Sequence, residues 1–167
     1  GKPRIVFSPD GQTLVFEEKG KLHLYAVPSL QSVTHWPGFR PAYSKDGSAM
    51  VYALTNRLVR RNLVTGQEVQ FGEAEDGVAA LALSPDGRTV VTSGSNSGGT
   101  MTFWDVLGQV PPVKVEKHTD TVEGLDFSPD GQTLASASWE AKLGLWNGKE
   151  RRNLDLLRGH KVHMSSV

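Results

Sequence analysis

Short apolar segments alternate with polar turns along the whole chain. Segments of four to six residues rich in valine, leucine, alanine and phenylalanine recur between clusters of glycine, proline, serine and aspartate. No window shows the 3.6-residue apolar period that is typical of an amphipathic helix, so the pattern indicates strands. The sequence therefore predicts an all-β fold with almost no helix.

One turn phrase recurs four times and divides the chain into repeats. It reads Ser-x-Asp-Gly, and its successive serines lie 36, 40 and 44 residues apart. Proline, present in three of the copies, presets φ at the second position, aspartate caps the turn, and glycine adopts the positive φ that other residues resist. Each copy lies between two apolar segments, so it predicts a hairpin. The copies are residues 8–11, 44–47, 84–87 and 128–131.

Two further segments follow each hairpin, so every repeat has four predicted strands. The fourth is the most polar, as expected of an outermost strand that faces solvent. A four-strand unit at this spacing fits the blade of a β-propeller. The predicted strands are 4–7, 13–16, 21–25 and 30–34; 39–43, 49–53, 57–61 and 67–71; 78–83, 89–93, 100–104 and 113–116; and 122–127, 133–138, 142–146 and 153–157.

We therefore predict about four four-stranded antiparallel sheets arranged radially as propeller blades. The units cover residues 1–37, 38–75, 76–118 and 119–160, and residues 161–167 are expected to begin a fifth. Four blades seldom close a ring of this kind, so three outcomes stay open: a part of a larger ring, an oligomer, or one copy that forms an open or compact four-bladed arc, with the first preferred as the origin of the sequence. Unpaired apolar blade faces favour self-association of the isolated chain, including a homo-oligomer that completes a ring.

The second half of the chain resembles the WD-repeat family. Residues 134–147, LASASWEAKLGLWN, follow the family pattern, with asparagine at the end where aspartate is usual. The preceding repeat ends in Phe103, Trp104 and Asp105, and Gly159-His160 matches the dipeptide that opens a repeat. In the first half, Tyr25 and Arg61 stand at the tryptophan position, and residues 7–16 are also similar to TolB-type propellers.

The resemblance implies a buried, hydrogen-bonded set in the last full repeat, made of His118, Ser136, Glu140 and Trp146. In this family a histidine, a strand serine or threonine, a turn aspartate and the tryptophan form such a set, and its role is structural. Glu140 stands at the aspartate position. Whether its longer side chain contacts the imidazole is the question that the sequence leaves open. Trp104, Asp105 and His160 are the motif residues of the neighbouring repeats.

Composition and charge exclude several classes of partner. Lysine plus arginine equals aspartate plus glutamate, 18 against 18, which argues against nucleic acid or an anionic membrane as the main partner. The absence of cysteine excludes disulfides and thiolate metal sites. No apolar run is long enough to span a membrane. We expect a cytoplasmic protein whose partners are other proteins or peptides.

No residue pattern points to catalysis, a cofactor or a metal. His160 and His163 are three residues apart, but no third ligand lies nearby in the sequence. The turn aspartates lack the dense spacing of a calcium loop. The glycine-rich residues 95–99 lack the lysine and helix of a phosphate loop. We therefore expect a protein that is not an enzyme, with no catalytic, cofactor-binding or metal-binding residues.

The resemblance implies a protein-interaction scaffold that binds through the loops at one end of the sheets. Candidate partner-binding residues there are Trp139, Trp36, Phe39 and Asn96, with Trp139 foremost because exposed tryptophan often dominates binding energy. Two alternatives stay open. A small molecule could bind in the central channel, where the innermost strands carry a few charged residues, or the chain could be a TolB-like periplasmic module. The charged residues are Arg4, Arg40, Glu123, Asp126 and His163.

Overall fold

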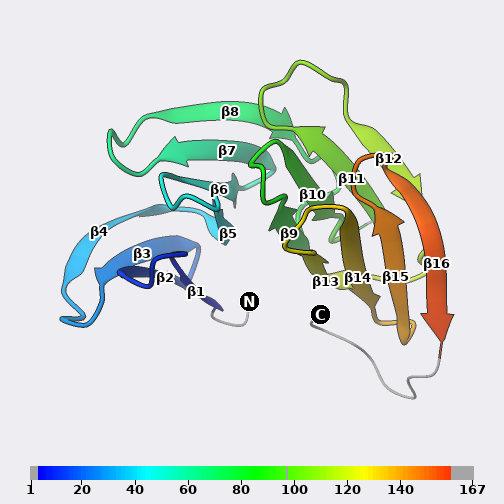
Figure 1. Ribbon diagram of the computed structural model, residues 1–167, viewed down its shortest axis with the longest axis horizontal. Coiled ribbons are helices and arrows are strands. Elements are labelled where there is room, and N and C mark those ends of the chain that lie inside the picture. The colour runs from blue at the N-terminus through cyan, green and yellow to red at the C-terminus, as the bar shows by residue number, and fades with distance from the viewer. Residues whose placement is uncertain (1–3, 97, 159–167) are drawn as a thin grey trace.

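The computed structural model describes residues 4–96 and 98–158, which form sixteen strands in four sheets (Figure 1). Each sheet has four antiparallel strands in sequence order. The first contains β1 (Arg4–Phe7), β2 (Thr13–Glu18), β3 (Lys21–Ala26) and β4 (Ser32–Pro37), and the second contains β5 (Phe39–Tyr43), β6 (Ala49–Leu54), β7 (Arg57–Asn62) and β8 (Glu68–Glu73). The third contains β9 (Ala80–Leu83), β10 (Thr89–Ser93), β11 (Thr100–Asp105) and β12 (Val113–Glu116), and the fourth contains β13 (Val122–Phe127), β14 (Thr133–Ser138), β15 (Lys142–Asn147) and β16 (Arg152–Arg158).

The four sheets are arranged radially, which confirms the predicted β-propeller blades. Neighbouring innermost strands contact each other in order, β1 with β5, β5 with β9, and β9 with β13. Figure 1 shows the sheets fanned around these inner strands as an arc that stays open between the first sheet and the fourth. Within the described ranges no helix is present that is long and apolar enough to cross a membrane.

Three apolar clusters hold the arc together, one at each junction between neighbouring sheets. Successive side chains of a strand point to opposite faces, so a central strand supplies two clusters at once. In β6, Met50 and Tyr52 join the cluster with the first sheet, whereas Val51 and Ala53 join the cluster with the third. This two-sided burial explains why the inner strands are apolar without alternation.

The turn phrases are closed by the same hydrogen bonds in all four copies. In the first, Ser8 Oγ donates to Asp10 at 2.6 Å and accepts from the Thr13 amide at 2.9 Å. Gly11 has a φ of 69° and donates to the Ser8 carbonyl. The hydrogen bond from the serine hydroxyl is the main cause that lowers the pKa of the aspartate in each turn, to about 2 at Asp46. The phrase is therefore a self-contained hairpin connection.

Two strands begin two residues later than the sequence predicts. The segment predicted at 30–34 is β4 over Ser32–Pro37, because Leu30 adopts a φ of 54° in the preceding turn. The segment predicted at 78–83 begins at Ala80, because Gly77, with a φ of 72°, closes a turn just before it. The predicted start of a fifth unit at 161–167 lies outside the described residues.

Candidate functional site

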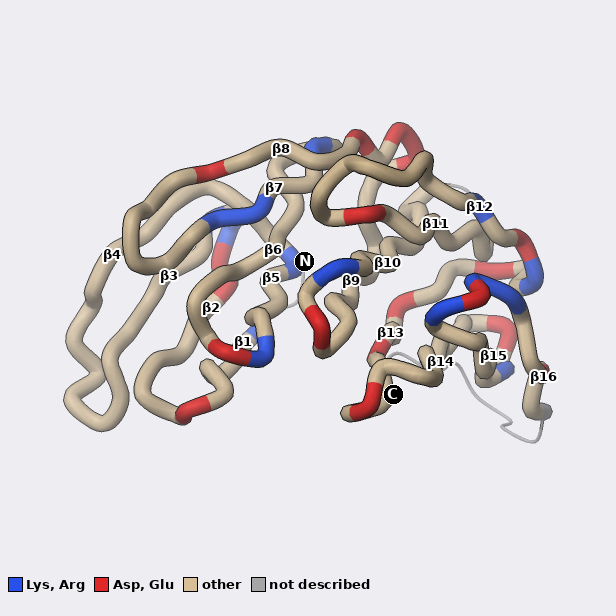
Figure 2. The backbone as a smooth tube through the Cα atoms, turned by 45° about the horizontal axis from the view of Figure 1, so that its top comes forward, with Lys and Arg blue, Asp and Glu red and all other residues tan. Residues whose placement is uncertain are grey.

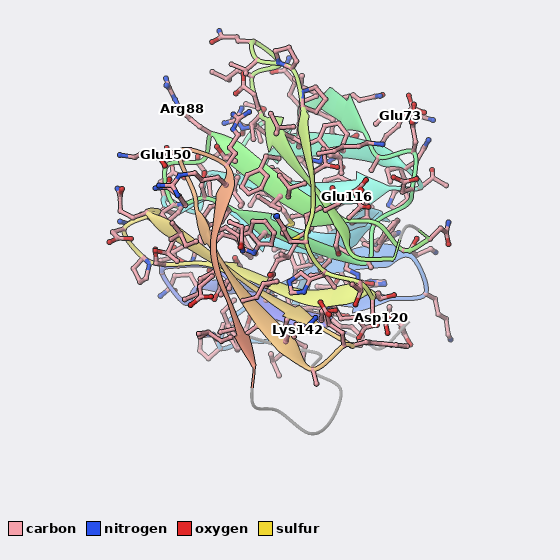
Figure 3. All side chains as sticks on the ribbon, turned by 90° about the vertical axis from the view of Figure 1, so that its right-hand side faces the viewer. Glu73, Arg88, Glu116, Asp120, Lys142 and Glu150 are labelled. Carbon is pink, nitrogen blue, oxygen red and sulfur yellow. The ribbon has the colours of Figure 1, made fainter. Side chains whose placement is uncertain are left out.

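Strand order divides the loops between two ends of the molecule. Each Ser-x-Asp-Gly turn joins the first strand of a sheet to the second, so all four turns lie at one end, here called the turn face. The loops between second and third strands, and those between sheets, lie at the other end, here called the loop face. Figure 3 shows Glu73, Glu116, Asp120 and Lys142 at the loop face and Arg88 and Glu150 at the opposite end.

His118, Ser136, Glu140 and Trp146 come together beneath the loop face of the fourth sheet. Trp146 Nε1 donates to Ser136 Oγ at 2.8 Å, and the same hydroxyl lies 2.7 Å from His118 Nε2. His118 Nδ1 lies 2.7 Å from Glu140 Oε1, so the glutamate does reach the imidazole. Gly144 leaves room for the set, since a Cβ there would lie 2.4 Å from Ser136 Oγ.

Glu140 is the electrostatic centre of this set. Burial alone would raise the pKa of its carboxyl, but hydrogen bonds from Lys142, Thr119 and His118 outweigh burial and lower the pKa to about 2. Lys142 forms an ion pair with the carboxylate, and Thr119 Oγ1 donates to it at 2.8 Å. An ionised carboxylate only accepts hydrogen bonds, so Nδ1 of His118 carries the proton. The sequence did not reveal the roles of Thr119 and Lys142, because their contacts arise from neighbouring loops rather than from the repeat motif.

Trp139 lies at the tip of the β14–β15 turn, directly beside this set. Its side chain is 42% exposed on the loop face. Its amide donates to the Thr121 carbonyl at 3.0 Å, and Ser138 Oγ donates to the Asp120 carbonyl at 3.0 Å. The turn closes through Ala141, which has a φ of 61°. The buried network and these bonds therefore fix the backbone of the turn that presents this aromatic side chain at the surface.

The third sheet keeps only part of the same arrangement. Trp104 Nε1 donates to Thr92 Oγ1 at 2.8 Å, as Trp146 does to Ser136. Asp105 lies at the turn face, where its carboxylate accepts the amides of Gln109 at 2.7 Å and Val110 at 3.1 Å and so caps the following loop. Asn96 is exposed on the loop face. His160 lies outside the described residues.

Trp36, a candidate partner-binding residue by sequence, is buried in the structure, which corrects that expectation. Trp36 is 5% exposed and packs between the first two sheets against Tyr52. The Arg61 guanidinium lies 4.8 Å from the centre of its ring. Trp36 pairs with Leu22 in the β3–β4 register, and this pairing directs it inward. Phe39 is partly buried against the cluster between the second and third sheets.

Charged residues of the inner strands gather around the axis of the arc. Burial lowers the pKa of the Arg40 guanidinium, and the charge of Arg4 adds to this effect, whereas Glu17 and Glu123 oppose it. The Arg40 amide also donates to Glu17 Oε2 at 2.9 Å. The carboxylates of Glu17 and Glu123 therefore offset part of the cost of holding the Arg40 charge at this place.

Metal-binding side chains are not clustered in the described part of the chain. Within residues 4–96 and 98–158, no three histidine, cysteine, aspartate or glutamate side chains lie together as a metal ion would need. The histidine pair at positions 160 and 163 lies outside these ranges. The buried His118 is held through both ring nitrogens and is closed to solvent. Its position suits a structural role rather than proton transfer to a substrate.

Comparison with known proteins identifies a family whose repeats match part of this chain. The family model described as "WD domain, G-beta repeat" matches residues 66–105 and 110–147. Each matched stretch contains the outermost strand of one sheet and three inner strands of the next. The sequence repeat is therefore offset by one strand from the structural blade, so it links neighbouring sheets.

Curated relatives match the chain over part of their length. The WD repeat-containing protein WDS homolog of Arabidopsis thaliana is 26% identical over 131 residues, covering 75% of this chain and 24% of the relative. The guanine nucleotide-binding protein subunit beta of the same plant is 30% identical, covering 62% and 27%. The anaphase-promoting complex subunit cdh1 of Dictyostelium discoideum is 31% identical, covering 52% and 11%. The chain thus spans about a quarter or less of each of these relatives.

Proposed function

The chain belongs to the WD-repeat family, and from this premise we propose that it is a non-catalytic module that binds other proteins through its loop face. Two of the relatives are subunits of larger assemblies by their names, a guanine nucleotide-binding protein and the anaphase-promoting complex. A rigid arc of sheets with variable loops suits this kind of assembly role.

The observation that carries the proposal is the exposed side chain of Trp139 on a hydrogen-bonded turn. Tryptophan is enriched among residues that dominate binding energy, because its large surface is buried at little cost in conformational freedom. The hydrogen bonds of the β14–β15 turn fix its backbone before any partner arrives. Thr119 and Asp120 lie on the adjoining loop, where they hydrogen-bond to Glu140 and Ser138, the two neighbours of Trp139.

A comparison of two single variants tests this surface. Trp139→Ala removes the proposed contact, and Val64→Ala removes an apolar side chain that is 86% exposed at the turn face. Purified proteins of both variants and the wild type are used to capture binding proteins, and the affinity of each captured partner is then measured. We expect Trp139→Ala to weaken binding about tenfold or more, with Val64→Ala like the wild type. Equal affinities for the wild type and Trp139→Ala would contradict the proposal.

We also propose that the two end faces of the arc are covered when the protein is assembled. On the first sheet, Ile5 and Phe7 are 61% and 59% exposed. On the fourth, Leu143 and Leu157 lie opposite each other in the β15–β16 register, and Leu157 is also exposed. These faces correspond to the sides through which the other sheets pack on their neighbours. For the isolated chain, a second copy offers the matching surface.

A further inference from the structure

The third sheet lacks the histidine that completes the network of the fourth. Ala74 and His118 each lie ten residues before a turn serine, Ser84 and Ser128, and both are buried. Thr92 pairs with Thr102 in the sheet as Ser136 pairs with Gly144. Trp104 completes the correspondence through its hydrogen bond to Thr92. Ala74 therefore occupies the position of the imidazole without filling it.

A pocket of about 160 Å³ opens at this place in the loop face. Its inner wall is formed by Ala74, Thr92, Thr102 and Trp104, between the second and third sheets. Pockets that hold drug-sized ligands are at least about 300 Å³. The space therefore suits the end group of one side chain rather than a whole metabolite.

The hydroxyl of Thr102 gives this pocket an unused hydrogen-bonding group. The residue is 7% exposed and lines the pocket. Its hydroxyl makes no hydrogen bond to any residue in the ranges that the structure describes, whereas the neighbouring Thr92 accepts from Trp104. The hydroxyl is therefore available to a group that enters the pocket, and a hydrogen bond to it would add to the affinity of that group.

The mouth of the pocket is acidic. Three carboxylates border it, those of Glu73, Glu75 and Asp76, against a single ammonium group, that of Lys114, which lies 3.5 Å from Asp76 Oδ2. Figure 2 shows these acidic positions in red where the chain leaves β8. The Glu73 carboxylate accepts a hydrogen bond from Asn56 at 2.7 Å and is held in place by it. The pocket therefore favours a positively charged end group.

We propose that this pocket binds an arginine side chain of a partner protein. A guanidinium has several N–H donors in one plane, so it can reach the Thr102 hydroxyl inside and the carboxylates at the mouth together. That the arginine belongs to a partner protein rests on the proposed interaction function. Binding of an arginine side chain by the pocket can be tested without any partner. The site is separate from Trp139, which lies in the next sheet.

The test uses the wild-type chain and N-acetyl-arginine amide as the probe. The indole N–H signals of Trp104 and Trp146 are followed by NMR during titration, with N-acetyl-citrulline amide as the neutral analogue of the same shape. We expect a saturable shift at Trp104 at about millimolar probe, and little change at Trp146 or with the citrulline analogue. An equal response to both compounds, or no response at Trp104, would overturn the proposal, whereas loss of partner binding by Trp139→Ala does not bear on it.

Three variants locate the binding groups. Thr102→Val keeps the volume and removes the hydroxyl, and Glu75→Gln removes one charge at the mouth. Glu116→Gln removes a charge from the same face without touching the pocket and serves as the matched control. We expect about threefold to tenfold weaker binding for the first two and wild-type binding for the control. Unchanged affinity in Thr102→Val and Glu75→Gln, or equal loss in all three, would show that the pocket is not the site.

Discussion

A single carboxylate connects the buried polar network of the fourth sheet. Glu140 connects a buried histidine, a threonine hydroxyl and a lysine from three places in the fourth sheet and its loops. Its side chain is almost wholly buried, so each of these bonds replaces one lost to water. The additional methylene of glutamate, compared with aspartate, does not prevent contact with His118. The network is therefore complete with glutamate at the position where the family usually has aspartate.

Replacing this carboxylate tests its contribution to stability. Glu140→Gln keeps the size of the side chain but loses its charge, and we expect a loss of about 1–2 kcal/mol in the free energy of unfolding at neutral pH. Urea unfolding followed by tryptophan fluorescence measures this loss. Glu18→Gln, which removes an exposed carboxylate from the first sheet, should change the stability very little.

The pH dependence of this loss has a definite sign. The folded pKa of Glu140 is about 2, below the ordinary value of 4.5, so the unfolded chain takes up the proton first as the pH falls. The stabilisation is therefore complete above about pH 4.5 and disappears as the pH falls toward about 2. The difference between the wild type and Glu140→Gln should shrink over this range. A difference that stays constant would show that the charge of Glu140 does not stabilise the fold.

At the level of strands and turns, the local pattern was sufficient to predict most of the fold. The Ser-x-Asp-Gly phrase closes its own turn through hydrogen bonds within six residues, so its meaning does not depend on distant parts of the chain. Most strand boundaries follow from these turns. The positions of β4 and β9 deviate because Leu30 and Gly77 adopt positive φ values, which composition alone does not reveal.

The direction of a side chain on an outermost strand was harder to predict. Trp36 and His35 are neighbours on β4, and one points inward while the other is exposed. A register irregularity between β3 and β4 lies next to Leu24, so the sequence alone did not determine which residue would be buried. The pocket at Ala74 was missed for a similar reason. It depends on a missing histidine and on how two sheets pack, although the spacing to Ser84 marks the position.

The contact between Trp36 and Arg61 explains how the second sheet manages without its motif tryptophan. Arg61 stands at that position, and Trp36 from the first sheet fills the space beneath it. Trp36→Ala should lower the free energy of unfolding by about 3–5 kcal/mol. Trp36→Phe should cost much less. An aromatic ring still fills most of the space, and the lost indole N–H has no hydrogen-bond partner among the described residues. Calorimetry on both variants checks this order, and equal losses would refute the packing explanation.

On the scale of the whole molecule, each sequence repeat contributes strands to two neighbouring sheets. Because each matched repeat spans β8 to β11 or β12 to β15, every repeat covers a junction between two sheets. The apolar clusters occupy these same junctions. Stability is therefore distributed along the arc, and only the outer faces of the first and fourth sheets lack a neighbouring sheet within the described chain.

The two end faces should also drive self-association of the isolated chain. Phe7, Leu14 and Tyr25 share one face through the β1–β2 and β2–β3 registers, and this side of the other sheets packs on the preceding sheet. A second copy can cover it with the corresponding face of its fourth sheet, where Leu143 and Leu145 lie. Burial of this apolar surface should make the isolated chain a dimer or larger oligomer at micromolar concentration.

Charge placed on the first face should prevent this association. Ile5→Lys with Phe7→Lys should give a folded monomer, because both side chains are exposed and their loss removes nothing from the three internal clusters. Val64→Lys adds charge at the turn face and should leave the oligomer intact. Multi-angle light scattering gives the mass of each protein, and circular dichroism checks that it stays folded. A monomeric wild type, or a double variant with the same mass as an oligomeric wild type, would show that these faces do not pair.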